Sequence, residues 1–130
     1  MNNQINHYKQ KLEYEMDSSD LFAAINAGEF LIVIDARKPF AFNEEHIPLA
    51  TNFPHREMTE ESTKNLDRNI LYVTYCDGIG CNASTKGALK MAELGFKVKE
   101  LIGGLDWWKR DGYATQGTKA KEGLKLNCAC

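Results

Sequence analysis

Apolar runs and amphipathic segments alternate along this chain. Residues 30–34 (FLIVI) and 70–75 (ILYVTY) form nearly continuous apolar runs that are partly β-branched, a pattern typical of strands covered on both faces of a parallel sheet. Shorter patterns predict three more strands, at 14–16, at 97–101 and at the end of an extended connection over 46–54. The chain therefore carries the strands of a sheet with two buried faces.

The first predicted helix begins after a segment rich in capping side chains. Asp17 to Ser19 supply oxygens for the helix N-terminus, and Leu21, Phe22 and Ile25 repeat on one face. Gly28 is placed to end this helix, because glycine readily takes the left-handed conformation of a helix C-terminus. Further helical segments are expected at 40–45, 59–66, 83–94 and 105–110.

The helix over 83–94 follows a loop at the end of the second long strand. Ala88, Leu89 and Ala92 are predicted to form its apolar stripe, with Gly95 as its C-cap. Helices that alternate with apolar strands predict an α/β domain with a central, mainly parallel sheet flanked by helices. No internal repeat or second domain is visible.

Composition agrees with one globular domain. The chain has 130 residues, of which 43% are hydrophobic and 26% charged, enough to bury one core. We expect a polar N-terminal arm over 1–12, the folded domain over 13–114, and a flexible, loosely packed tail over 115–130.

Charge and hydropathy narrow the range of partners. The 16 basic and 18 acidic residues are spread along the chain for a net charge of −2, so no basic patch for nucleic acid is visible. The polar start lacks a signal-peptide core, and no apolar run approaches the roughly 20 residues of a membrane span. We therefore expect a cytoplasmic protein without nucleic-acid or membrane partners, whose four cysteines are free, reactive or metal-binding thiols.

Cys76 is the strongest candidate for chemistry, because it follows the strand over 70–75 directly. Ligands of open α/β sheets bind at the carboxyl ends of strands. Two glycines let the next loop curl with its amides inward, beside the positive end of the following helix dipole, where a thiolate or persulfide is stabilised. The competing interpretation is a buried core cysteine, which leaves the glycines and the helix unexplained. The predicted cradle comprises Asp77, Gly78, Ile79, Gly80, Cys81 and Asn82.

Four segments in order resemble the rhodanese family, over about 14–113. IDAR at 34–37 resembles its Asp-x-Arg, and EHIPLATNFP at 45–54 its Gly-His-Ile-Pro-Gly-Ala segment. Tyr75-Cys76 matches the end of its catalytic strand, and GGLDWWKRDGY at 103–113 its Gly-Gly-x-x-x-Trp-x-x-x-Gly-Tyr signature. The resemblance implies a rhodanese-like three-layer fold and a sulfurtransferase that loads sulfane sulfur onto Cys76 as a persulfide.

The chain departs from the family pattern at several positions. Glu45 and Leu49 replace glycines, and Cys76 lies 19 positions (95 − 76) before Gly95, which indicates a longer loop. A longer loop makes a wider cradle, as in the related arsenate reductases and cell-cycle phosphatases. The loop also lacks Arg and Lys, and Asp77 would repel a dianion. Thiosulfate is therefore expected to be a poorer donor than polysulfide or a persulfide.

Each of the other cysteines allows more than one interpretation. Cys81 is either a resolving thiol that attacks a Cys76 persulfide or sulfenate, or a small loop residue packed beneath the helix, because spacing alone does not give sulfur geometry. Cys128 and Cys130 end the chain as Cys-Ala-Cys, either as relay thiols, as a weak metal signal, or as a silent tail.

Four residues are expected to support the site without performing chemistry. Asp35 and Arg37 are predicted to form an ion-pair framework at the sheet edge, and His46 to hold its connection by hydrogen bonding rather than act as a base. Trp108 is predicted to lie in the core, whereas Trp107 borders either the pocket or solvent.

Sulfur transfer to a thiol or cyanide acceptor, or to a protein acceptor, is the leading functional hypothesis, and it needs no cofactor and no metal. Arsenate reduction or phosphate-ester cleavage is favoured by the longer loop and opposed by its lack of arginine. The alternative that is not an enzyme is a noncatalytic sulfur carrier or regulatory module.

Overall fold

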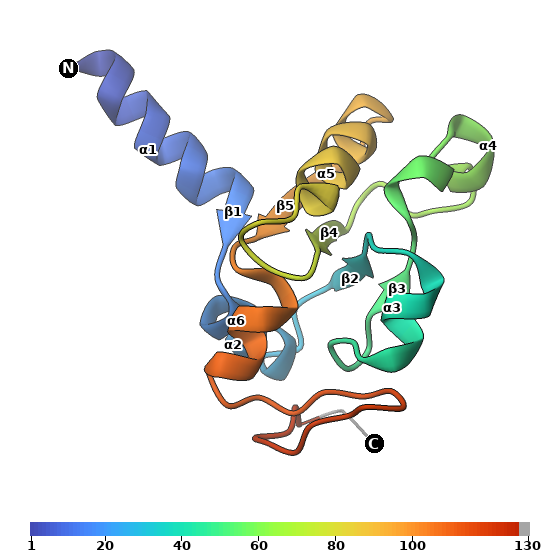
Figure 1. Ribbon diagram of the computed structural model, residues 1–130. Helices are drawn as coiled ribbons and strands as arrows, with labels where there is room; N and C mark the ends of the chain where they lie inside the picture. Colours follow the sequence, from blue (N-terminus) through green and yellow to red (C-terminus); the bar gives the residue numbers. More distant parts are fainter. Residues whose placement is uncertain (128–130) are drawn as a thin grey trace.

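The computed structural model describes residues 1–127, which fold around one parallel sheet (Figure 1). The strands lie in the order β1-β5-β4-β2-β3, and every neighbouring pair is parallel. Their bounds are β1 Glu15–Met16, β2 Leu31–Asp35, β3 Thr51–Asn52, β4 Leu71–Tyr75 and β5 Lys97–Leu101. β4 is thus the central strand, between β2 and β5.

Helices cover both faces of this sheet. They are α1 Asn2–Tyr14, α2 Ser18–Asn26, α3 Pro39–Glu44, α4 Glu60–Thr63, α5 Ala83–Glu93 and α6 Gly104–Arg110, with a 3₁₀ turn, η1, at His55–Glu57. α2 and α6 pack together on one face, and α5 and η1 lie on the other. The predicted class, a mainly parallel sheet flanked by helices, is confirmed.

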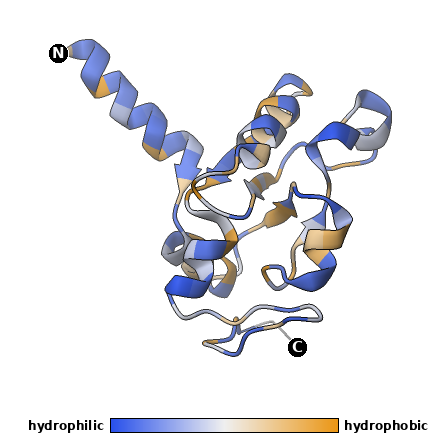
Figure 2. Cartoon of the chain, in the orientation of Figure 1, coloured by the Kyte–Doolittle hydropathy of each residue, from blue (hydrophilic) through white to orange (hydrophobic). Residues whose placement is uncertain are grey.

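Alternating side chains of the long strands divide the core in two. Val33, Val73 and Tyr75 point into the cluster that contains Trp108, whereas Ile34 and Tyr72 belong to the cluster on the α5 side. Because β2 and β4 are buried on both sides, their sequences are continuous apolar runs, visible as hydrophobic colour in the centre of Figure 2.

Local signals account for the helix starts. Asp17 accepts a hydrogen bond from the backbone N–H of Asp20 in a capping box, as expected for the N-terminus of α2, and Gly28 follows this helix with φ +76°.

Among residues 1–127, no helix is long and apolar enough to cross a membrane.

The apolar stripe predicted for α5 is wrong. Ser84, Gly87 and Met91 face the sheet, whereas Leu89 is 60% exposed. The helix lies so close to its neighbours that a Cβ on Gly87 would meet the Ala36 Cβ at 3.4 Å. The buried stripe therefore lies one position earlier along the helix than the predicted one.

The predicted polar arm at the N-terminus is a helix. α1 spans residues 2–14 with no buried residue and projects from the body of the molecule (Figure 1). Lys11 and Glu15 form an ion pair four residues apart, at 3.0 Å, near its C-terminal end. The helix has no packed apolar face, which is the signal that the sequence prediction relied on.

The described part of the tail, residues 115–127, is more tightly held than predicted. His46 and Gln116 exchange two backbone hydrogen bonds, of 2.8 and 3.0 Å, and Leu126 is only 4% exposed in the main core. The segment joins the domain because Leu126 supplies core volume next to α2, so the folded unit continues past residue 114.

Candidate functional site

Cys76 lies at the carboxyl end of the central strand, and the loop after it leads into α5. Its side chain is 1% exposed. The position follows from the buried run of β4, which ends at Tyr75 and leaves Cys76 at the edge where the loop begins. Cys76 therefore lies between strand, loop and helix, at the position predicted from the sequence.

The N-terminus of α6 holds the start of the loop. The backbone N–H groups of Leu105 and Asp106 donate to the carbonyl oxygens of Cys76 and Asp77, at 3.0 and 2.8 Å. Gly104 is required here, because a Cβ at its φ of +54° would collide with the Cys76 carbonyl oxygen. The carbonyl oxygens of Cys76 and Asp77 therefore hold the start of the loop against α6.

Because the loop carbonyls bond to α6, the N–H groups of the same peptides point away from α6. The C=O and N–H of a trans peptide point in opposite directions, so the N–H groups of Asp77 and Gly78 point away from α6. Within residues 1–127, the N–H groups of Asp77, Gly78, Ile79 and Gly80 have no hydrogen-bond acceptor. These free donors and the start of α5 match the anion cradle that the glycines predicted.

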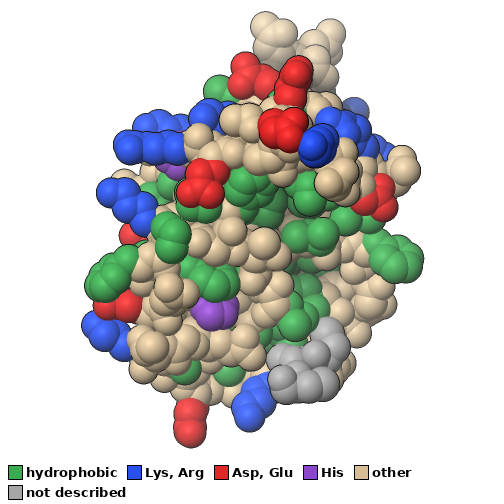
Figure 3. Space-filling model, turned by 90° about the vertical axis from the view of Figure 1, so that its right-hand side faces the viewer, with side chains coloured by type: hydrophobic (Ala, Val, Ile, Leu, Met, Phe, Trp, Pro, Cys, Tyr) green, Lys and Arg blue, Asp and Glu red, His purple; other side chains and the backbone are tan. Residues whose placement is uncertain are grey.

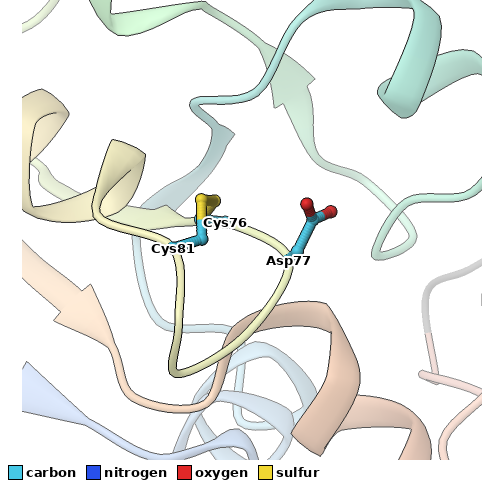
Figure 4. Close-up of side chains that lie close together, drawn as sticks. All are labelled: Cys76, Asp77 and Cys81. Carbon is cyan, nitrogen blue, oxygen red and sulfur yellow. A yellow bond between two sulfur atoms is a disulfide. The ribbon is translucent and has the colours of Figure 1, made fainter.

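Cys76 and Cys81 form a disulfide in this structure (Figure 4). The loop curls so that their Cα atoms lie 6.1 Å apart, within the range that a disulfide needs. Cys81 is partly exposed, so it does not pack as a buried residue beneath the helix. The nucleophile predicted at Cys76 is available only when this bond is reduced.

Arg37 organises the polar groups at the sheet edge. Its Nε and Nη2 donate to the two carboxylate oxygens of Asp35 at 2.9 and 2.6 Å, and the Tyr75 hydroxyl donates to Asp35 Oδ2 at 2.7 Å. Burial by itself would lower the pKa of Arg37, but the bonds to Asp35 and Asp77 outweigh it and raise that pKa. Burial and the Asp35 charge raise the pKa of Tyr75 well above its usual value. The predicted Asp35–Arg37 framework is present.

Asp77 is also part of this framework. Arg37 Nη1 donates to Asp77 Oδ1 at 2.8 Å, although the Asp77 side chain is 69% exposed. Asp77 thus shares one guanidinium with Asp35, so the three side chains together carry a net charge of −1, and the repulsion of an anion by Asp77 stays a prediction. The pair could not be predicted from the sequence because Arg37 and Asp77 lie 40 residues apart.

Two hollows of different charge flank the loop. One, of about 270 Å³, reaches both sulfurs and is lined by Arg37, Lys38, His55 and Arg56, with Asp77 as its acidic residue. The other, of about 560 Å³, lies on the far side of the loop, over 78–82, and contains Glu15 and Glu100. An anionic molecule is therefore drawn to Cys76 from the first side, which we call the cationic hollow.

The group Cys76, Asp77 and Cys81 lies close enough together to be considered for a metal, with ligand atoms within 4.8 Å of one another. Both sulfurs are used in the disulfide, and Asp77 binds Arg37. Three ligands are also one short of a structural zinc site, so the group does not fit a metal in this state.

Comparison with known proteins decides the family. The model of the rhodanese-like domain matches residues 17–111. The chain belongs to the rhodanese-like family. This confirms the resemblance found in the sequence.

Solved structures agree with this assignment. A crystallised protein from Bacillus halodurans is 43% identical, with a TM-score of 0.87, and the match covers 98% of this chain and 94% of that one. A rhodanese-like domain from Anabaena is 26% identical, with a TM-score of 0.73 and coverage of 82% and 81%. A thiosulfate sulfurtransferase from Pseudomonas aeruginosa is 27% identical, with a TM-score of 0.69 over 80% of this chain and 20% of that protein. No curated protein matches the chain.

The remaining predicted residues of this rhodanese-like domain lie away from the sulfurs. His46 stacks on Phe42, and its Nδ1 lies 2.7 Å from the Phe42 carbonyl oxygen, in keeping with a structural role. Trp108 is fully buried and donates to the Ala114 carbonyl oxygen at 3.0 Å, whereas Trp107 is 43% exposed. Cys128 and Cys130 lie outside the described residues.

Three residues of the cationic hollow were missed by the sequence analysis. Lys38 follows β2, while His55 and Arg56 follow β3. The signal was available, because the carboxyl ends of parallel strands meet at one edge and bring the residues after them together. Charged side chains of both signs and hydrophobic ones are interspersed on the face seen in Figure 3.

Proposed function

We propose that this protein is a sulfurtransferase that takes sulfane sulfur onto Cys76 as a persulfide and passes it to a thiol or cyanide acceptor. The observation that carries the proposal is the position of Cys76, buried at the end of β4 beside four loop amides without acceptors in residues 1–127. The name of the Pseudomonas relative, a thiosulfate sulfurtransferase, supports the same chemistry.

The geometry suggests how each step proceeds. The Cys76 thiolate attacks the sulfane sulfur of the donor, the donor's sulfur–sulfur bond breaks, and the rest of the donor leaves as an anion. The loop amides and the N-terminus of α5 stabilise the persulfide anion that remains. A nucleophilic acceptor then takes the outer sulfur and restores the thiolate. No cofactor or metal enters this proposal.

The cationic hollow changes the argument about donors. Thiosulfate needs a cation beside the attacked sulfur, and the loop supplies none, but Lys38 and Arg56 reach the same space from other segments. Slow thiosulfate turnover therefore stays a prediction, because cations and Asp77 line the same space, and a direct comparison of donors tests it. We propose an anionic donor in either case, thiosulfate or a small persulfide, in a reducing cytoplasmic setting that keeps Cys76 a thiol.

The two alternatives to a sulfurtransferase, arsenate or phosphate-ester chemistry and a noncatalytic sulfur carrier, predict different results. Arsenate or phosphate-ester chemistry requires an arginine that binds equatorial oxygens. Arg37 is already committed to Asp35, Asp77 and the Glu45 carbonyl oxygen, which leaves Arg56, on the wall of the cationic hollow, for that role. A sulfur carrier would take up one sulfur without turning over, whereas an enzyme produces thiocyanate repeatedly from donor and cyanide.

The test is intact-mass spectrometry of reduced, anaerobic protein after polysulfide treatment. We expect the mass to rise by one sulfur in Cys81→Ser and to return with a reductant, and we expect no gain at the loop in Cys76→Ser. If Cys76→Ser gains reducible sulfur at Cys81 to the same extent, Cys76 is not the persulfide carrier.

A further inference from the structure

We propose that Cys81 is a resolving thiol, and that the domain reduces sulfane sulfur to sulfide at the same site. The proposal rests on the proposed function, because it begins from a persulfide on Cys76. It assigns a role to the second loop cysteine and a second product, sulfide, to the enzyme.

The disulfide provides the geometric support. Cys76 is anchored by β4 and by the Leu105 N–H bond to its carbonyl oxygen. Cys81 lies two residues before the start of α5, and its N–H donates to the Gly78 carbonyl oxygen at 3.2 Å. Both anchors are intact with the sulfurs bonded. The fold therefore accommodates the bond that resolution would form, without unfolding the loop.

The resolving step balances as a thiol–disulfide exchange. The Cys81 thiolate attacks Cys76 Sγ, which forms the Sγ–Sγ bond and breaks the bond between Cys76 Sγ and the outer sulfur. The outer sulfur leaves with that electron pair, takes a proton and becomes hydrosulfide. The sulfane sulfur is reduced by two electrons, and the two cysteine thiols are oxidised to the disulfide.

The choice between transfer and resolution depends on which sulfur is attacked. An external acceptor attacks the outer sulfur of the persulfide, whereas Cys81 reaches the inner one, Cys76 Sγ, to which the structure bonds it. Because Cys81 is on the same loop, its attack is intramolecular and does not depend on acceptor concentration. Sulfide release should therefore dominate when acceptor is scarce.

A dithiol must complete the cycle. One of its thiols attacks the more exposed Cys81 sulfur, and its second thiol releases the mixed disulfide, so the dithiol becomes a disulfide while Cys76 and Cys81 become thiols. The cationic hollow reaches both sulfurs and offers the path for such a reductant. The net reaction converts a persulfide and a dithiol into a thiol, sulfide and a disulfide.

A single-turnover experiment tests the proposal. The Cys128→Ser, Cys130→Ser background removes the other thiols; it is reduced, freed of reductant under anaerobic conditions, and mixed with one equivalent of glutathione persulfide. We expect close to one sulfide released per chain, and a mass lower by two hydrogens. With Cys81→Ser added, we expect the persulfide to accumulate and sulfide release to fall at least tenfold, to the level of a protein-free control.

The outcomes separate the two proposals. Equal sulfide release with and without Cys81, or a stable persulfide in the background protein, overturns the resolving role and leaves Cys76 as a sulfur carrier. If Cys81→Ser takes up no sulfur, and Cys76→Ser behaves identically, the proposed function itself fails.

Discussion

Replacing Gly104 by alanine should loosen the active-site loop from α6. This residue has φ +54°, and a Cβ there would collide with the Cys76 carbonyl oxygen. α6 would have to withdraw, so the bonds from the Leu105 and Asp106 N–H groups to the loop carbonyls would be lost. The positive φ costs an alanine about 1 kcal/mol and each lost bond about 1 kcal/mol, which gives a destabilisation of about 3 kcal/mol.

Two other glycines provide matched controls. Gly28 also has a positive φ, +76°, but a Cβ there meets no atom within 4 Å, so its alanine variant should lose only about 1 kcal/mol. Gly80 lies in the loop itself with open space around it and no positive φ. Its alanine variant should be nearly neutral.

Equilibrium urea unfolding of the reduced proteins measures these differences. With an m-value of about 2 kcal/mol per molar urea, Gly104→Ala should unfold about 1 M urea earlier than Gly28→Ala. It should also form the Cys76 persulfide more slowly, because the cradle amides are positioned by the lost bonds. Equal midpoints for Gly104→Ala and Gly28→Ala would refute the role assigned to the α6 contacts.

Three further predictions concern the groups around the site. Arg56→Gln should lower kcat/KM for thiosulfate several-fold, measured by thiocyanate production, while the surface control Lys64→Gln should leave it unchanged; equal effects would exclude the cationic hollow as the donor site. Tyr75→Phe removes the donor to Asp35 Oδ2 and should destabilise the fold by about 2 kcal/mol in urea unfolding; an unchanged midpoint would contradict this. Burial and nearby cations lower the pKa of His55, so the unfolded chain binds a proton at this residue more readily than the folded one. The free energy of unfolding should therefore fall as pH drops below about 6.5. This fall should be smaller in His55→Gln, and identical pH profiles of the two proteins would refute the assignment.

The strands and most helices could be predicted because their signals are local. The buried runs of β2 and β4 extend over consecutive residues, and Asp17 and Thr59 both cap helices within three positions of themselves. α1 was missed since none of its residues is buried. The stripe of α5 was misplaced by one position because two of the residues that face the sheet, Ser84 and Gly87, carry little hydrophobic signal.

The site was predicted only where one segment builds it. Cys76 and its loop amides are contiguous, so strand, glycines and helix were enough to find them. Arg37, which pairs with Asp77, and the cations of the hollow lie in the segments after β2 and β3. These segments reach Cys76 only because of the strand order in the sheet. The Cys76–Cys81 disulfide depends on how the loop curls, which spacing does not give.

The arrangement of the hollows also decides where an added charge would act. An arginine placed at Ile79 or Asn82 would add a positive charge to the loop itself. Both residues line the hollow that contains Glu15 and Glu100, on the far side of the loop from Lys38 and Arg56. An arginine there would meet carboxylates rather than a donor held beside Cys76, so Ile79→Arg should leave thiosulfate kcat/KM within about twofold of wild type. Ala41→Arg, on the wall of the cationic hollow, should raise it instead. A selective gain for Ile79→Arg in the thiocyanate assay would mean that the donor enters from the acidic side, and that the loop, not the sheet edge, selects it.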